Sequence, residues 1–80
     1  MADKIDKRTK PLVVALGEDL RRVREELGIA QIQLAAKIGM EPTNLAKIER
    51  GEKNVTLDSL RRIADGLGVE LIVRFGRHKS

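Results

Sequence analysis

Two short helical patterns joined by a tight turn occupy residues 31–51, which read QIQLAAKIGMEPTNLAKIERG. Apolar side chains recur at helical spacing in both patterns, at Leu34, Ala35, Ile38, Leu45 and Ile48. Between them, Gly39 permits a sharp turn, and Pro42 suits the first turn of the second helix, which is expected to end near Arg50. Two short helices separated by about three residues that include a glycine have the spacing of a helix-turn-helix unit.

Further helices are predicted on both sides of this unit. Before it, apolar residues follow the helical period over 12–27, where Gly17 carries only a mild propensity cost. After it, Thr56 is a favourable N-cap for a helix over 57–67, and Gly68 is a suitable stop. The predicted fold class is therefore all-α, with four helices.

The pattern changes again in residues 69–75, which alternate in character and are rich in β-branched side chains. This favours a short C-terminal β-strand. Such a strand has no partner within its own chain, and a symmetric copy of itself is the simplest candidate. Leu71, Val73 and Phe75 are accordingly predicted to serve dimerisation. The alternatives are that 69–75 crosses the core as extended chain or forms a fifth helix.

Length and charge indicate one domain with basic ends. The 80 residues suffice for a single helix-turn-helix domain, 11–68, preceded by a basic arm, 1–10, and followed by the strand and a basic tail, 69–80. The net charge of +4 resides mostly in the two ends. The arm either reaches along a nucleic-acid backbone or minor groove, or is disordered without a specific role.

Composition argues against several other classes. Cysteine is absent, His78 is the single histidine, and no catalytic set or glycine-rich phosphate loop is visible, so neither an enzyme nor a cofactor or metal site is expected. Phe75 is the single aromatic residue, whereas single-strand binding relies on several stacking side chains. The N-terminus lacks a signal-peptide pattern and no stretch is long enough to span a bilayer, so a soluble, cytoplasmic protein without a membrane partner is expected.

Three segments together resemble the Cro/repressor (Xre-like) helix-turn-helix family. They are LRRVREELGIAQIQLAAKIG (20–39), NLAKIERG (44–51) and TLDSLRRIADGLGV (56–69). The similarity covers about residues 16–69, with the motif elements in the family's order and spacing. It implies a compact, lambda-repressor-like domain of four helices that binds duplex DNA as a homodimer.

The resemblance also implies roles for individual side chains. Base edges in the major groove would be contacted by Pro42, Thr43, Asn44 and Lys47. Phosphates would be contacted by Gln31, Arg50, Lys53 and Asn54. Arg24 and Glu49 match a structural ion pair of the family. The chain departs from the family pattern at Ala30 and Glu41, where Ser or Thr commonly precedes a helix, and this leaves the individual base contacts open.

The expected function is that of a sequence-specific transcriptional regulator, most simply a repressor, on an inverted-repeat operator. The C-terminal residues look most like those of HipB-type antitoxins, which implies a toxin as a possible second partner. Restriction–modification controller proteins are similar in size but commonly end in a helix. A protein-interaction module that no longer binds DNA is a further alternative, which the retained Gln31, Lys47, Arg50 and Lys53 disfavour.

Overall fold

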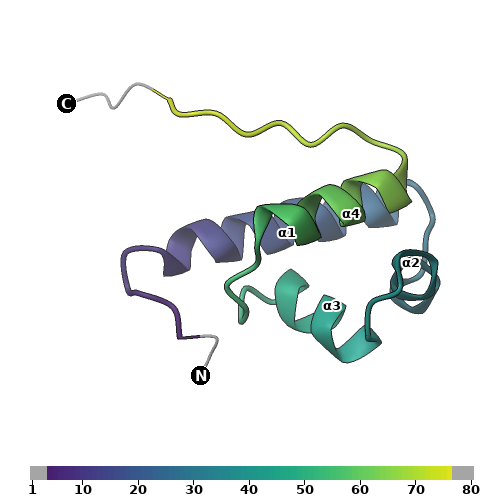
Figure 1. The fold of residues 1–80 in the computed structure, drawn as a ribbon, viewed down its shortest axis with the longest axis horizontal. Helices are drawn as coiled ribbons and strands as arrows, with labels where there is room; N and C mark the ends of the chain where they lie inside the picture. The colour runs from purple at the N-terminus through teal and green to yellow at the C-terminus, as the bar shows by residue number, and fades with distance from the viewer. Residues whose placement is uncertain (1–3, 77–80) are drawn as a thin grey trace.

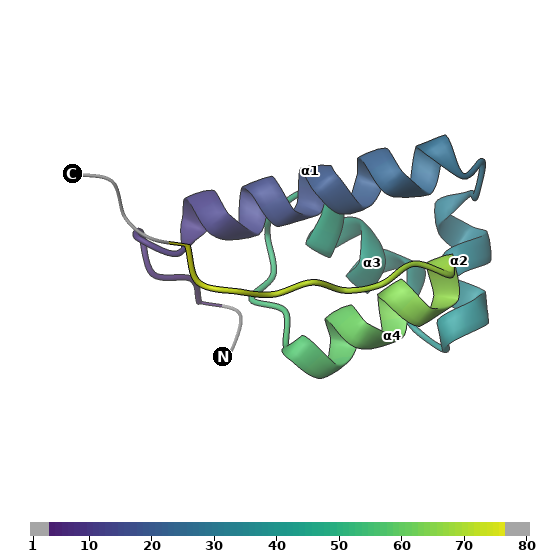
Figure 2. The ribbon, with the colours of Figure 1, turned by 90° about the horizontal axis from the view of Figure 1, so that it is seen from above.

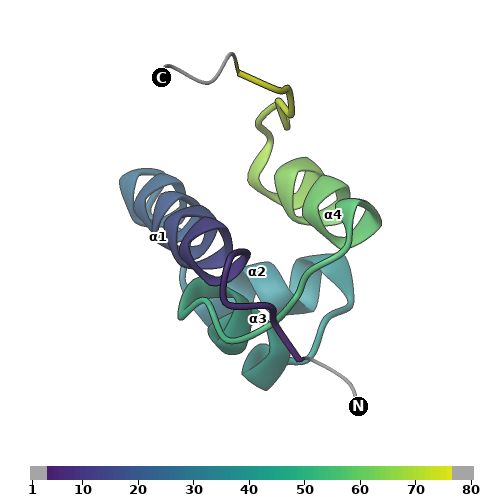
Figure 3. The same cartoon turned by 90° about the vertical axis from the view of Figure 1, so that its left-hand side faces the viewer.

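The computed structural model describes residues 4–76 and contains, over that range, four helices: α1 (Lys10–Glu26), α2 (Gln31–Ile38), α3 (Pro42–Glu49) and α4 (Leu57–Leu67). Helices α1 and α4 form one layer, and α2 and α3 pack beneath it (Figures 1 and 3). The all-α prediction with four helices is confirmed. Within this part of the chain, no helix is both long and apolar enough to cross a membrane.

The core lies where the two layers meet. Its buried members come from all four helices and are Leu20, Leu34, Ala35, Leu45, Ile48, Ile63 and Leu67. Leu34 of α2 and Leu45 of α3 are completely enclosed. Burying a leucine side chain stabilises the fold by about 1.5–3 kcal/mol, so these two residues fix the helix-turn-helix unit firmly to the rest of the domain.

The turn between α2 and α3 consists of residues 39–41. Gly39 adopts a left-handed conformation with φ +68°, which a residue with a side chain rarely adopts. The peptide N–H of Met40 donates to the carbonyl oxygen of Ala35 at 2.9 Å, and this closes the end of α2. The turn chemistry predicted from the sequence is therefore what sets the angle between α2 and α3.

Gly17 has a larger role than its propensity suggests. It is buried in α1, and a Cβ atom at this position would lie 2.5 Å from the carbonyl oxygen of Glu49. The same atom would also collide with the carbonyl oxygen of Ile48. The expectation of a mild cost was incomplete, because it considered α1 alone, and the absent side chain is what lets α1 and α3 approach each other.

The predicted helix starts differ in how they are capped. Thr56 caps α4, since its hydroxyl oxygen accepts from the peptide N–H of Ser59 at 3.1 Å. Ala30 has no side chain able to do this for α2. In compensation, the side-chain carbonyl of Gln33 accepts from the peptide N–H of Ala30 at 2.9 Å. One of the two reciprocal bonds of a capping box is thus retained.

The C-terminal segment does not form the predicted strand. Among residues 4–76 no strand is present, and residues 69–76 run as extended chain over the groove between α1 and α4 (Figure 2). A β-ladder requires a second strand, and the single chain offers none. The alternative of extended chain across the core is the one observed. The last residues of the expected tail, 77–80, lie outside the described residues, as do residues 1–3 of the arm.

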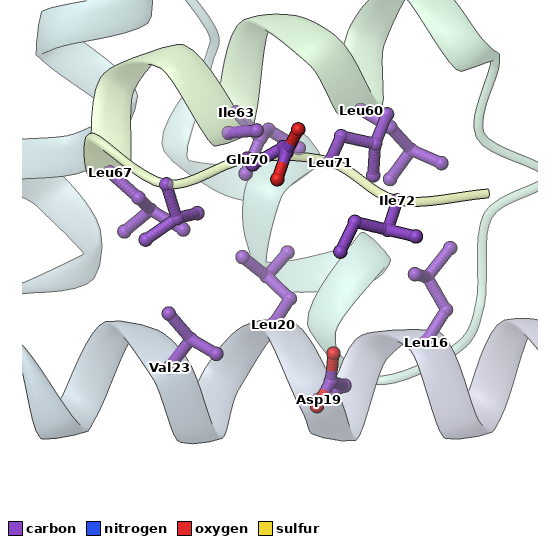
Figure 4. A pocket seen from close by; sticks show the side chains of 12 residues that line it. Leu16, Asp19, Leu20, Val23, Leu60, Ile63, Leu67, Glu70, Leu71 and Ile72 are labelled. Atoms are coloured by element: carbon purple, nitrogen blue, oxygen red, sulfur yellow. The ribbon is translucent and has the colours of Figure 1, made fainter.

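The groove beneath this segment has a volume of about 300 Å³ and an apolar lining. Leu16, Leu20 and Val23 of α1 face Leu60, Ile63 and Leu67 of α4 across it, and Ile72 reaches in from the C-terminal segment (Figure 4). Leu71 is half-buried, whereas Val73 and Phe75 are exposed, Phe75 completely. The extended chain therefore covers the core incompletely and keeps apolar surface of its own in contact with solvent.

Candidate DNA-recognition surface

The side chains predicted to meet base edges lie along α3, from its first turn to its last. Pro42, Thr43 and Lys47 are exposed, whereas Leu45 is buried on the opposite face of the helix. Asn44 is half-buried and lines a small hollow of mixed polar and apolar character that also includes Ser59 and Arg62 of α4. The structure thus leaves three of the four predicted base-contacting residues exposed, Pro42 and Thr43 in the first turn of α3 and Lys47 in its last turn, and leaves Asn44 half-buried.

Behind this surface, α1 and α3 are joined by a buried ion pair. The Nε atom of Arg24 lies 2.7 Å from Oε2 of Glu49, and its Nη2 atom lies 3.0 Å from Oε1. Both side chains are almost fully enclosed, with exposed fractions of 10% and 4%. The hydrogen bonds to Glu49 raise the pKa of Arg24 above its ordinary value. Arg24 and Glu49 are therefore brought together as the family resemblance implied, in the interior between α1 and α3.

The third guanidinium nitrogen of Arg24 is also hydrogen-bonded. Its Nη1 atom donates to the carbonyl oxygen of Ile29 at 2.7 Å, in the connection between α1 and α2. Among the described residues, every buried side-chain nitrogen or oxygen atom has a hydrogen-bond partner. Every guanidinium nitrogen of Arg24 and both carboxylate oxygens of Glu49 therefore take part in a hydrogen bond, which favours a buried charge pair.

Gln31, a predicted phosphate contact, is placed at the first residue of α2 and is half-buried. Its side-chain amide donates to Oε1 of Glu49 at 3.0 Å. No pattern in the sequence indicates this bond, because the two residues lie on different helices and carry no recognisable spacing. Gln31 is therefore connected to the buried ion pair as well as being accessible from outside.

Three further predicted phosphate contacts follow the end of α3. Arg50 and Asn54 are exposed and Lys53 is half-buried. The guanidinium group of Arg50 donates to both carboxylate oxygens of Glu52 at 3.0 Å. This pairing lowers the pKa of Glu52, and the nearby charges of Lys10 and Lys47 act in the same direction.

Two cationic side chains that were not predicted as site residues hold this region in place. Lys10, at the start of α1, donates to the carbonyl oxygen of Gly51 at 2.6 Å. Arg62 of α4 donates to the carbonyl oxygen of Ile38 at the end of α2, at 2.5 Å. Basic side chains near helix C-termini interact favourably with the last carbonyl groups. A basic residue in the sequence signals such a role only once the facing helix end is known.

This arrangement defines a class of protein. A short helix with an exposed polar first turn is held across a tight turn by a second short helix, and both are fixed to a buried core; this is a helix-turn-helix DNA-binding domain. A family model described as helix-turn-helix matches residues 20–73. The chain belongs to this family, whose members are transcriptional regulators and not enzymes.

Curated relatives include control proteins and a phage repressor. The control protein C.MunI of Mycoplasma sp is 36% identical over 59 residues, which cover 72% of this chain and 80% of the relative. The control protein C.BamHI of Bacillus amyloliquefaciens is 32% identical, with 78% of each chain covered. The immunity repressor of Bacillus phage phi105 is 33% identical over 72% of this chain, but the match spans only 40% of that repressor.

Solved structures support the same fold. The clp gene regulator ClgR of Corynebacterium glutamicum superimposes with a TM-score of 0.73 at 33% identity, covering 75% of this chain and 77% of that one. The controller protein C.AhdI of Aeromonas hydrophila has the same TM-score at 32% identity, covering 75% and 91%. The controller protein C.Esp1396I, solved as a tetramer on its 35 base-pair operator, gives a TM-score of 0.71 at 34% identity, covering 74% and 78%.

Proposed function

We propose that this regulator is a repressor that binds an inverted-repeat operator as a homodimer, with the first turns of α3 in the major groove. The observation that carries the proposal is the exposed, polar beginning of α3, held rigidly by the buried residues behind it. A groove-reading helix needs donors and acceptors on its outer face and a fixed orientation. The start of α3 has both.

Lys47 is the proposed base-reading residue with the most defined role. It is exposed on the same face as Thr43, one helical turn further along α3. An ammonium group there would donate to guanine, and the methyl group of Thr43 would meet a thymine methyl. Pro42 and Asn44 complete the proposed base-edge set, with Asn44 on the side nearest α4.

Phosphate contacts are proposed on both sides of this helix. Gln31 at the start of α2 stands on one side, and Arg50, Lys53 and Asn54 stand at the end of α3 and in the loop that follows. Contacts of this kind position the protein on the duplex without reading its sequence. They also make the affinity fall as salt rises.

Dimerisation is proposed to use the C-terminal segment. That segment returns along α4 and ends at the same end of the molecule as the start of α1 (Figure 2). Figure 1 shows that it lies on the far side of the α1–α4 layer from α3. Its exposed Val73 and Phe75, together with Leu71, would pair with the same segment of a second copy and leave α3 uncovered.

Among the narrower classes, a repressor or control-protein role is the better supported. The relatives reported above are a phage immunity repressor, control proteins and a gene regulator, and none of these is an antitoxin. The HipB-type antitoxin alternative, with a toxin as partner, rests on the C-terminal sequence alone.

Selection of binding sites from random duplex DNA, followed by a salt titration of the enriched pool, tests the proposal. We expect an inverted repeat whose half-sites lie about one helical turn, 34 Å, apart. Weak, strongly salt-dependent binding without an enriched sequence would contradict it, because that is the behaviour of a protein that meets only phosphates.

A further inference from the structure

The carboxylate of Glu49 binds more than its ion-pair partner. Arg24 donates to both of its oxygens, and the side-chain amide of Gln31 donates to Oε1 as a third hydrogen bond. Glu49 is the last residue of α3, and Gln31 is the first residue of α2. A single buried carboxylate therefore connects α1, the start of α2 and the end of α3.

This contact restricts the orientation of the Gln31 side chain. A glutamine amide carries two N–H donors, and only one of them is directed at Glu49. Gln31 is half-buried, so part of its side chain remains accessible at the N-terminus of α2, where peptide N–H groups also favour an anion. The amide of Gln31 is thus held in one orientation before any phosphate arrives.

We propose that Glu49 is a positioning residue for DNA binding: it fixes the amide of Gln31 so that its free N–H group meets a backbone phosphate. This inference rests on the proposed function. A glutamine that is free to rotate must lose rotamer freedom when it binds, whereas Gln31 has already lost it on folding. The gain in DNA affinity is expected to be several-fold, up to about tenfold.

A first test examines the free protein. The sequence contains two glutamines, Gln31 and Gln33, so Gln33 serves as an internal control. By NMR, one side-chain N–H proton of Gln31 should exchange slowly with water, and its chemical shift should differ from that of the other. The two side-chain N–H protons of exposed Gln33 should both exchange rapidly. Identical behaviour of the two glutamines would overturn the inference.

A second test measures the coupling on DNA. Substituting Glu49 alone would strand the charge of Arg24, so the ion pair is replaced as a whole by Arg24→Met with Glu49→Met, a type of exchange that folded proteins often tolerate. Gln31→Ala is then compared in the natural and the Met/Met backgrounds, with Gln33→Ala as the matched control. We expect Gln31→Ala to lower affinity about tenfold in the first background and about two- to threefold in the second, and Gln33→Ala to have equal effects in both.

These outcomes distinguish failure of the positioning role of Glu49 from failure of the proposed function. Equal losses for Gln31→Ala in both backgrounds, with binding to the selected operator retained, would overturn the positioning role and leave the proposed function intact. Failure of the natural protein to bind any selected duplex would overturn the proposed function, and the inference with it. If the Met/Met chain does not fold, the exchange rates of the Gln31 amide protons decide the matter.

Discussion

Gly17 of α1 lies directly against the carbonyl group of Glu49 in α3, and no side chain fits between the two backbones. This contact sets the distance between α1 and α3. It also brings Arg24, two turns further along α1, within reach of the Glu49 carboxylate at 2.7 Å. The close approach and the buried ion pair therefore belong to one interface.

Substitution of Gly17 by alanine should destabilise the domain. Alanine favours a helix by about 1 kcal/mol over glycine, but overpacking a rigid site costs about 1–3 kcal/mol and occasionally more. The clash should prevail, because the atoms in the way are backbone atoms of α3. Urea unfolding measures the change, with Gly76→Ala as the control because a Cβ there meets nothing within 4 Å. A more stable Gly17→Ala protein would show that α1 and α3 are further apart.

Substitution of Arg24 by alanine should lower the free energy of unfolding by about 3–5 kcal/mol, because it leaves the Glu49 carboxylate buried without its counter-charge. Arg21→Ala is the matched control on the same helix. Its ion pair with Glu25 is exposed, and such pairs contribute only about 0–1 kcal/mol. Thermal unfolding of both variants gives the comparison. Equal, small changes in the melting temperature of the two variants would be inconsistent with a buried Arg24–Glu49 pair.

Much of this fold could be predicted from sequence, for identifiable reasons. Helix ranges follow from periodicity, and the cap at Thr56 and the left-handed Gly39 follow from local chemistry. The consequence of Gly17 could not be foreseen, because periodicity shows which face is buried but not how near the next backbone lies. A strand over residues 69–75 was predicted from propensity, but propensity does not supply the second strand that a ladder requires, and the described residues of the single chain contain none.

The candidate site was predictable in a similar, partial way. Its residues on α3 follow from helical spacing and the family resemblance. The hydrogen bond from Gln31 to Glu49 and the pairing of Arg50 with Glu52 join side chains whose geometry depends on how the helices end and pack. Neither bond leaves a pattern in the sequence.

Substitution of Lys47 by alanine should change which DNA sequence is preferred. A side chain that donates to one base contributes about 1–3 kcal/mol of discrimination at that position. Lys47 is exposed and distant from the core, so stability should be unaffected. Affinity is measured on the selected operator and on operators changed at single positions. A uniform loss on every sequence would show that Lys47 contacts phosphate only.

Substitution of Glu52 by glutamine should strengthen binding to any duplex. Its carboxylate occupies the guanidinium group of Arg50 and lies within the field of Lys10 and Lys47, so a phosphate must compete with it. Exposed ion pairs are weak, so the expected gain in affinity is modest, up to about fivefold. Binding is measured at several salt concentrations on operator and random DNA, with Glu18→Gln as the control. Unchanged or weaker binding would mean that Arg50 does not meet a phosphate.

Removal of residues 70–80 should weaken dimerisation. Without this segment the exposed apolar side chains of Val73 and Phe75 are lost, and so are the backbone groups available for pairing with a second copy. Because Leu71 and Ile72 also cover the groove between α1 and α4, part of any effect could come from stability. Phe75→Ser distinguishes weaker dimerisation from lower stability, because Phe75 is completely exposed and its loss should leave the melting temperature unchanged.

Sedimentation equilibrium of the natural chain, the truncated chain and Phe75→Ser makes this measurement. Ile32→Ser is the control, because Ile32 is also a large, exposed apolar residue but belongs to α2. We expect the truncated chain and Phe75→Ser to dissociate at concentrations where the natural chain and the Ile32→Ser control remain dimeric. If the truncated chain and Phe75→Ser keep the mass distribution of the natural chain, dimerisation does not use this segment. The next candidates are then the exposed starts of α1 and α4, where Leu12 and Leu57 also face solvent.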